Sequence, residues 1–236
     1  MASALLDEAP GRALAVYAHP DDPEVSCGGT LAHWARAGAD VRLVVVNAGD
    51  KGSPDAATDP AELTERRARE VDAAAGVLGL AGVERMGLPD GEVTNDVALR
   101  ARLVALIRTH RPDIVVCPDP TAVFFGDSYV NHRDHREVGW AVVDAVAPAA
   151  ASPLYFPETG PPHQVGGLLL SGTFEPDVWV DISDSLELKV AAVQCHESRV
   201  GGDPALVAEL LRTRTAESGA QVGVSHAESF RRLRFG

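Results

Sequence analysis

Basic residues, aromatic residues and cysteines are all scarce in this chain, and each shortage argues against a class of function. The 236 residues include 21 Lys and Arg against 34 Asp and Glu, which gives a formal net charge of -13. Such a surface repels nucleic-acid phosphates and anionic lipid headgroups. Aromatic residues make up only 5%, too few for a platform on which single-stranded bases stack. We therefore expect neither nucleic acid nor a membrane as a partner.

The cysteines are few and widely spaced. Cys27, Cys117 and Cys195 form neither an even-numbered disulfide framework nor a C-x-x-C zinc knuckle. Residues 1–11 lack a basic stretch followed by an apolar one, so we expect no secretion signal. No run of about 18 apolar residues that could span a bilayer is present. These features predict reduced thiols and a cytoplasmic location.

Short apolar runs alternate with helical segments along the chain. Strands are expected at 13–18, 41–46, 83–86, 113–117, 168–170 and 178–180, and helices at 28–38, 61–79, 97–110, 132–147 and 186–195. This alternation predicts an α/β, Rossmann-like fold with a mostly parallel sheet and helices on both faces. Hydrophobic residues make up 45% and no linker is visible, so a single domain over 1–236 is expected.

A first polar cluster, His19-Pro20-Asp21-Asp22-Pro23-Glu24, follows the first predicted strand directly. Open parallel sheets bind ligands beyond the carboxyl ends of their strands, so these side chains occupy a typical site position. The alternative interpretation is an acidic turn in which Asp21 or Asp22 caps the next helix.

A second cluster, Asn131-His132-Arg133-Asp134-His135, opens the helix expected after the fourth strand. Residues three apart share a helix face, so His132 and His135 can converge. The alternative is a helix start with polar capping residues. In a doubly wound sheet the first and fourth strands are neighbours where the strand order reverses, and both clusters would then face one crevice.

Two imidazoles and a carboxylate form a typical catalytic zinc set with a fourth position left for water. Zinc lowers the pKa of its water to about 7. A further carboxylate can then act as general base. A further histidine can stabilise the oxyanion or protonate the leaving nitrogen.

Three motifs of the chain are typical of a known family. They are His19-Pro20-Asp21-Asp22, Gly28-Gly29-Thr30 and His132-Arg133-Asp134-His135. Together they resemble the LmbE / PIG-L family of zinc-dependent N-deacetylases. The resemblance implies one Zn²⁺ per chain, held by His19, Asp22 and His135. It further implies that Asp21 is the general base, that His132 acts on the intermediate or the leaving amine, and that Asp134 tunes His132.

The resemblance also implies a small-molecule N-acyl substrate, such as an amino sugar, and a possible homo-oligomer. Asp90 is either a turn residue or a partner of a substrate hydroxyl. Arg67 and Tyr129 are further candidate substrate contacts. The chain departs from the family pattern at Pro23, at Arg133 and at Arg199, where the family often has Gln.

Three other functions stay open at this point. The first is an amidase that cleaves a larger thiol-sugar conjugate by the same chemistry. The second is a two-metal phosphoesterase, which needs more carboxylates or a bridging ligand. The third is a sugar-binding relative of the fold that lacks the reaction.

Overall fold

A single eight-stranded sheet organises the computed structural model, which describes residues 4–6, 8–200 and 203–235. The strand order is β1-β9-β10-β8-β5-β2-β3-β4. The strands are β1 (Ala4–Leu5), β2 (Arg12–Tyr17), β3 (Asp40–Asn47), β4 (Gly82–Leu88), β5 (Ile114–Pro118), β8 (Gly167–Ser171), β9 (Val178–Asp181) and β10 (Ala227–Arg234). Neighbouring strands pair in parallel except where β10 runs antiparallel between β8 and β9. The predicted mostly parallel sheet is confirmed.

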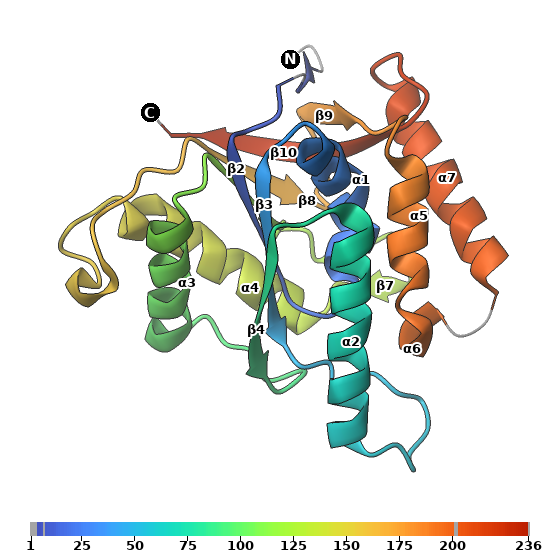
Figure 1. Cartoon of the computed structure of the whole chain (residues 1–236), viewed down its shortest axis with the longest axis horizontal. Helices are drawn as coiled ribbons and strands as arrows, with labels where there is room; N and C mark the ends of the chain where they lie inside the picture. Colours follow the sequence, from blue (N-terminus) through green and yellow to red (C-terminus); the bar gives the residue numbers. More distant parts are fainter. Residues whose placement is uncertain (1–3, 7, 201–202, 236) are drawn as a thin grey trace.

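Helices cover both faces of this sheet, as Figure 1 shows. One face carries α1 (Asp22–Arg36), α2 (Pro60–Leu78), α5 (Leu186–Gln194), α6 (Glu197–Val200) and α7 (Pro204–Ala220). The other face carries α3 (Val97–His110) and α4 (Arg133–Asp144), which continues into the π-helical turn η1 (Ala145–Ala150). No helix in these described ranges combines the length and apolar character that a bilayer crossing requires.

Strand β2 shows why the apolar runs are continuous. Ala13, Ala15 and Tyr17 face one core, whereas Leu14 and Val16 face the other. Successive side chains of a strand point to opposite faces, so a strand covered on both sides must be apolar at every position.

The order of strands reverses at β2, which lies between β3 and β5. The expected adjacency of the first and fourth strands is therefore present: Ala13 pairs with Ile114 and Ala15 with Val116. The carboxyl ends of β2 and β5 open onto the crevice in which sheets of this kind bind ligands.

Helix α1 differs from its prediction. It begins at Asp22 rather than at Gly28, and Pro23 stands in its first turn. Proline is tolerated there because the first backbone N–H groups of a helix have no partner within it. The helix is broken at Cys27, where φ is -144° and ψ is 17°. The first polar cluster thus includes the opening turn of α1.

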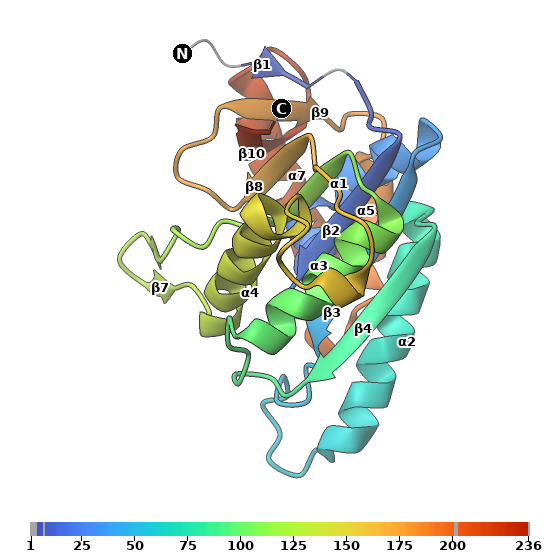
Figure 2. The same cartoon turned by 90° about the vertical axis from the view of Figure 1, so that its left-hand side faces the viewer.

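The sequence did not predict several elements. They are β1, α6, α7, β10, the 3-10 turn η2 (Pro157–Thr159), and a small hairpin of β6 (Phe124–Phe125) and β7 (Tyr129–Val130). Strand β10 carries charged side chains at several positions, which weakens its apolar pattern. The hairpin projects beside α4, where Figure 2 labels β7. It brings Tyr129 to the molecular surface.

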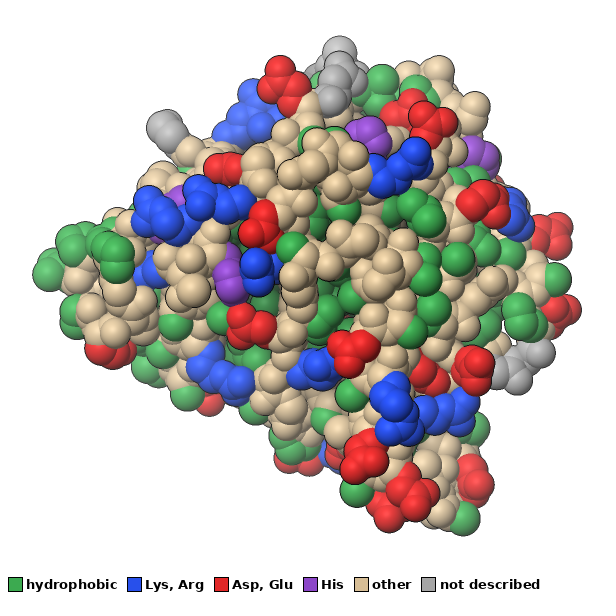
Figure 3. All heavy atoms as spheres, in the orientation of Figure 1, with side chains coloured by type: hydrophobic (Ala, Val, Ile, Leu, Met, Phe, Trp, Pro, Cys, Tyr) green, Lys and Arg blue, Asp and Glu red, His purple; other side chains and the backbone are tan. Residues whose placement is uncertain are grey.

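On the face shown in Figure 3, Lys and Arg side chains are interspersed with Asp and Glu side chains. This face carries no continuous basic stripe of the kind typical of nucleic-acid binding.

Candidate metal centre

Both polar clusters lie at the carboxyl edge of the sheet and face each other. His19 follows β2, and its backbone N–H donates to Asp22 Oδ2 at 2.7 Å. His132 caps the N-terminus of α4, since its Nδ1 accepts the backbone N–H of Asp134 at 3.2 Å. His135 is the third residue of that helix and lies in its first turn.

Candidate ligand atoms of three residues, including both carboxylate oxygens of Asp22, lie close together. His19 Nδ1 lies 3.1 Å from Asp22 Oδ2 and 3.1 Å from His135 Nε2. The same His135 atom lies 3.1 Å from Asp22 Oδ1. A tetrahedral zinc ion with bonds of about 2.0–2.1 Å holds its ligand atoms about 3.3 Å apart. The donor set therefore fits a single zinc ion with little movement.

The remaining ring nitrogens of both histidines have acceptors. His19 Nε2 lies 3.0 Å from Asp90 Oδ1, and His135 Nδ1 lies 2.8 Å from Asn131 Oδ1. Each outer N–H can donate to its acceptor, which leaves a lone pair on the nitrogen that faces the metal position. The sequence analysis gave Asn131 no role. Its position four residues before His135 was the feature of the sequence that could have indicated this contact.

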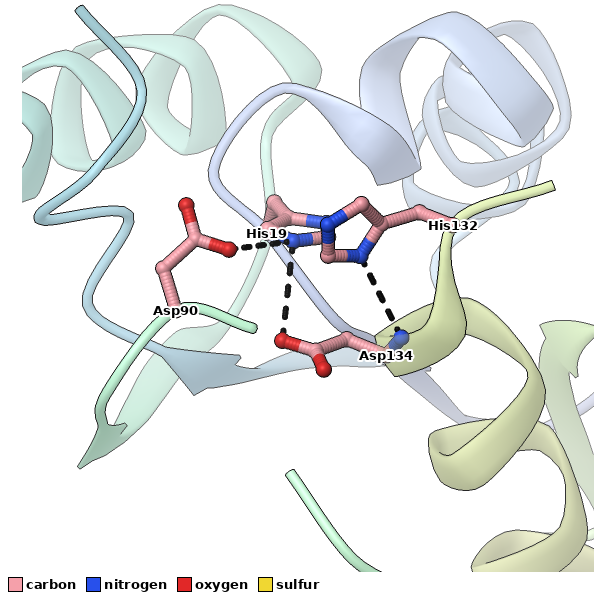
Figure 4. Close-up of side chains that lie close together, drawn as sticks. All are labelled: His19, Asp90, His132 and Asp134. Carbon is pink, nitrogen blue, oxygen red and sulfur yellow. Dashed lines mark hydrogen bonds and ion pairs between the residues drawn. The ribbon is translucent and has the colours of Figure 1, made fainter. Parts of the chain in front are cut away.

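A second group of candidate ligands adjoins the first. It consists of His19, Asp90, His132 and Asp134 (Figure 4), whose candidate ligand atoms lie within 4.8 Å of one another. Asp134 is fully buried, and its Oδ2 accepts from the backbone N–H of Gly91 at 2.8 Å. The same oxygen accepts from the Asn47 side chain at 3.1 Å. The atoms of the first group are closer together, so the first group is the better single-ion site.

Asp134 relates to His132 mainly through its backbone. Its carboxylate lies 3.8 Å from His19 Nε2, whereas its own N–H donates to His132 Nδ1. This N–H fixes the orientation of the His132 ring. The carboxylate itself ties α4 to the end of β3, where Asn47 is the last residue, a link that sequence reasoning did not reveal.

The charges at the site shift several pKa values. Burial opposes a charge on His19, but hydrogen bonds to Asp22 and Asp90 outweigh burial and raise the pKa of His19 to about 10. Burial also works against ionisation of Asp22, yet His135 and His19 hold its pKa well below the usual range.

The pKa values of Asp21 and His132 shift in opposite directions, and each shift favours the neutral form of its side chain. Burial and the nearby charge of Asp22 raise the pKa of Asp21 to about 6, against the opposing influence of Arg67, His196 and Arg199. Burial and the charge of His19 lower the pKa of His132. A carboxyl group with a raised pKa and an imidazole with a lowered pKa in one crevice are typical of an acid–base pair.

Eight of the nine predicted site residues line one cavity of about 690 Å³. They are His19, Asp21, Asp22, Arg67, Asp90, Tyr129, His132 and His135, and the buried Asp134 lies behind them. Arg67 is buried and donates to Gly49 O at 3.2 Å. Lys51 and Arg199 also line the cavity, and Arg199 Nε lies 3.4 Å from Asp21 Oδ2.

A buried ion pair supports the broken helix α1 from behind. Lys189 Nζ donates to Val25 O at 2.7 Å and lies 2.5 Å from Glu228 Oε1. The two oxygens of Glu228 accept the backbone N–H groups of residues 29–30 at 3.0 and 2.7 Å. Lys189 and Glu228 thus satisfy backbone groups on both sides of the break at Cys27.

Glycine at position 29 is required by close packing against the residue that follows β9. A Cβ atom there would lie 2.7 Å from the Ile182 side chain. Cys27, the thiol beside the metal loop, is fully buried and accepts a hydrogen bond from the Tyr17 hydroxyl at 3.2 Å.

Comparisons with known proteins agree with this geometry. Diacetylchitobiose deacetylase of Thermococcus kodakarensis is 31% identical over 224 residues, which cover 93% of this chain and 82% of that protein. A 1D-myo-inositol 2-acetamido-2-deoxy-alpha-D-glucopyranoside deacetylase of Mycobacterium sp. (strain JLS) is 29% identical over 86% of this chain and 78% of its own.

A solved structure is similar over nearly the whole fold. N,N'-diacetylchitobiose deacetylase from Pyrococcus horikoshii, complexed with an inhibitor, superposes with a TM-score of 0.87 at 28% identity. The match covers 95% of this chain and 84% of that one. The family model described as PIG-L, GlcNAc-PI de-N-acetylase, matches residues 14–146, a range that contains both polar clusters. Because that range is more than half of the chain and the similarity extends well beyond it, this protein belongs to the PIG-L family.

Proposed function

We propose that this chain is a zinc-dependent hydrolase that removes an N-acyl group, acetyl or larger, from an amino sugar or a related small molecule. The observation that carries the proposal is the convergence of His19, Asp22 and His135 beside Asp21 and His132 in one cavity. The relatives are named as deacetylases of N-acetylated amino sugars, which supports the substrate class.

The proposed ligands are His19 Nδ1, Asp22 and His135 Nε2. When zinc is bound there, it acts as a Lewis acid on a carbonyl oxygen and lowers the pKa of water. Asp90 and Asn131 hold the two imidazole rings in the orientation that this binding needs.

Two side chains of the cavity are suited to move protons. Asp21 is the proposed general base because its carboxyl faces the cavity and is outside the proposed ligand set. His132 is the proposed donor to the leaving nitrogen, since its Nδ1 is occupied by the Asp134 N–H and its other nitrogen is left for the substrate. The amide nitrogen must take a proton before it can leave as an amine.

Lys51, Arg67 and Asp90 form the proposed polar wall for the amine half of the substrate. They offer donors and an acceptor of the kind that recognise sugar hydroxyls. Tyr129, on the hairpin, lines the same cavity and is 53% exposed, so it can contact substrate from the outer side.

Metal analysis and product release together test the proposal. Purified protein should contain one zinc ion per chain and release acetate from N-acetylglucosamine or diacetylchitobiose, and a chelator should abolish the release. Two ions per chain with turnover of a phosphate ester would favour the phosphoesterase instead. Binding of sugar without hydrolysis under zinc supplementation would favour a non-catalytic relative.

Location and assembly stay predictions. The three cysteines are unpaired, which supports a reducing, cytoplasmic compartment. Sedimentation analysis of the purified chain tests whether it forms a homo-oligomer.

A further inference from the structure

We infer that the crevice has a second lobe that receives the acyl half of the substrate, and that this enzyme accepts apolar acyl groups larger than acetyl. The inference rests on the proposed function and extends it to the acyl side. We call the 690 Å³ cavity described above the amine lobe. The acyl lobe is a separate cavity of about 550 Å³, lined by Tyr17, Asp119, Phe125, Ser171 and Arg214 among others.

The proposed metal position lies at the junction of the two lobes. Asp22 and His135, two of the three candidate ligands, line both cavities. Val25, Ser26 and Tyr129 are also shared. A carbonyl group held at this junction therefore has one cavity on each side.

The positions of the proton-transfer groups decide which half of the amide enters which lobe. Asp21 and His132 line the amine lobe and are absent from the lining of the acyl lobe. The leaving nitrogen must lie within hydrogen-bond reach of its proton donor, so it belongs beside His132. The acyl substituent leaves the carbonyl carbon on the other side and points into the acyl lobe.

The acyl lobe is much larger than an acetyl group needs. A methyl group is about the size of a water molecule, whose share of liquid volume is about 30 Å³. The lobe, at about 550 Å³, falls instead within the range of small-molecule binding pockets.

The lining of the lobe is mixed, and two parts of it suit an apolar chain or ring. The ring of Phe125 packs against Phe174 with centroids 4.8 Å apart and lies 5.9 Å from Tyr129. On another wall, the Tyr17 hydroxyl donates to Cys27 Sγ at 3.2 Å and can accept from Ser171 Oγ, which lies 2.8 Å away. Because this polar pair needs no outside partner, burying an apolar group against it leaves no donor or acceptor unsatisfied.

Helix α7 contributes to both lobes and provides a control position in the amine lobe. Leu210 lines the amine lobe and Arg214, one helical turn later, lines the acyl lobe. Both side chains are exposed to solvent, so their replacement should not disturb the core.

The test compares glucosamine carrying acetyl, butyryl and phenylacetyl groups. We expect kcat/KM for the butyryl and phenylacetyl substrates to equal or exceed the value for acetyl. Phe125→Ala should lower the phenylacetyl-to-acetyl ratio about tenfold, the change expected when an aromatic contact of about 1.4 kcal/mol is lost. Phe125→Leu should lower it less, and Leu210→Ala should leave the ratio unchanged.

A binding measurement keeps the inference separate from the proposed function. Acetate, butyrate and phenylacetate are titrated calorimetrically into the zinc-loaded protein, with Phe125→Ala and Leu210→Ala as the variant pair. Tighter binding of phenylacetate than of acetate, weakened only by Phe125→Ala, supports the acyl lobe even if no amide is cleaved. Equal binding of all three acids, or a more than tenfold fall in kcat/KM from acetyl to butyryl, overturns it. Hydrolysis of the acetyl substrate alone would leave the proposed function intact.

Discussion

His19 Nε2 lies 3.0 Å from Asp90 Oδ1, across 71 positions of sequence. The imidazole can donate its proton only at this nitrogen if its Nδ1 is to present a lone pair to a metal. Asp90 therefore selects the ring form of a proposed ligand and also lines the cavity. The sequence offered this residue only as a turn aspartate or a substrate contact.

Asp90→Ala should weaken zinc binding about 10- to 100-fold, because partners of metal-bound histidines typically contribute that much to affinity. Competition with a chromophoric chelator measures the affinity. Asp90→Asn keeps an acceptor oxygen and should lose less. Glu92→Ala, which removes an exposed partner of Lys51, is the control. An unchanged zinc affinity in Asp90→Ala, with a raised KM, would make Asp90 a substrate contact alone.

Asp21→Asn should retain zinc and lose turnover by about 10²- to 10⁴-fold, the usual contribution of a general base. His135→Ala should lose both the metal and the activity, because it removes a proposed ligand. Metal content by mass spectrometry and acetate release from N-acetylglucosamine separate the two variants. Wild-type turnover by metal-loaded Asp21→Asn would exclude Asp21 as the base.

Zinc binding should release a proton at neutral pH. The pKa of His19 is raised to about 10 in the metal-free protein, so the ring is protonated below that pH and must lose a proton to bind zinc. Apparent zinc affinity should rise by up to about tenfold per pH unit between pH 6 and 8. Asp22 adds nothing to this dependence because its lowered pKa leaves it ionised throughout.

Calorimetry in two buffers with different ionisation enthalpies counts the released protons. The apparent binding enthalpies in the two buffers should differ by about the difference between the ionisation enthalpies of the buffers, which corresponds to one released proton. Identical enthalpies in both buffers would mean that His19 is already neutral in the metal-free protein.

Lys189→Met should lower the free energy of unfolding by about 3–5 kcal/mol, because it leaves the buried Glu228 carboxylate without a charge partner. Lys189 and Glu228 side chains are only 2% and 4% exposed. Arg212→Met, on α7, breaks a solvent-exposed pair with Glu187 of α5 and should produce no measurable change. Urea unfolding followed by circular dichroism compares them. Equal unfolding midpoints for the two variants would show that the Lys189–Glu228 ion pair does not stabilise α1.

The sequence predicted most of the parallel part of the sheet and brought both motifs to one edge. It could do so because strands buried on both faces are continuously apolar, and because the reversal of strand order places β2 beside β5. The spacing of His132 and His135 and the position of the first cluster after β2 predicted that both clusters face one crevice. The choice of His19, Asp22 and His135 as the ligands came from the resemblance to the family.

What remained hidden depends on contacts between distant segments. Asn47 meets Asp134 across 87 positions, and Glu228 meets residues 29–30 across about 200. Polar side chains of this kind carry no periodicity, so nothing local distinguishes them from exposed ones. The early start of α1 was missed for a different reason: Pro23 looked like loop sequence, although a helix accepts proline in its first turn.

The anchoring of α1 by Lys189 and Glu228 has a consequence for how the molecule can be divided. A fragment that stopped at residue 146, where the family match stops, would still encode every proposed zinc ligand. It would lack Lys189 and Glu228, which bond to backbone groups on both sides of the break in α1. It would also lack strand β10, which carries Glu228. We therefore expect such a fragment to hold the proposed zinc ligands less firmly than the whole chain does, because the support for α1 comes from residues after position 146.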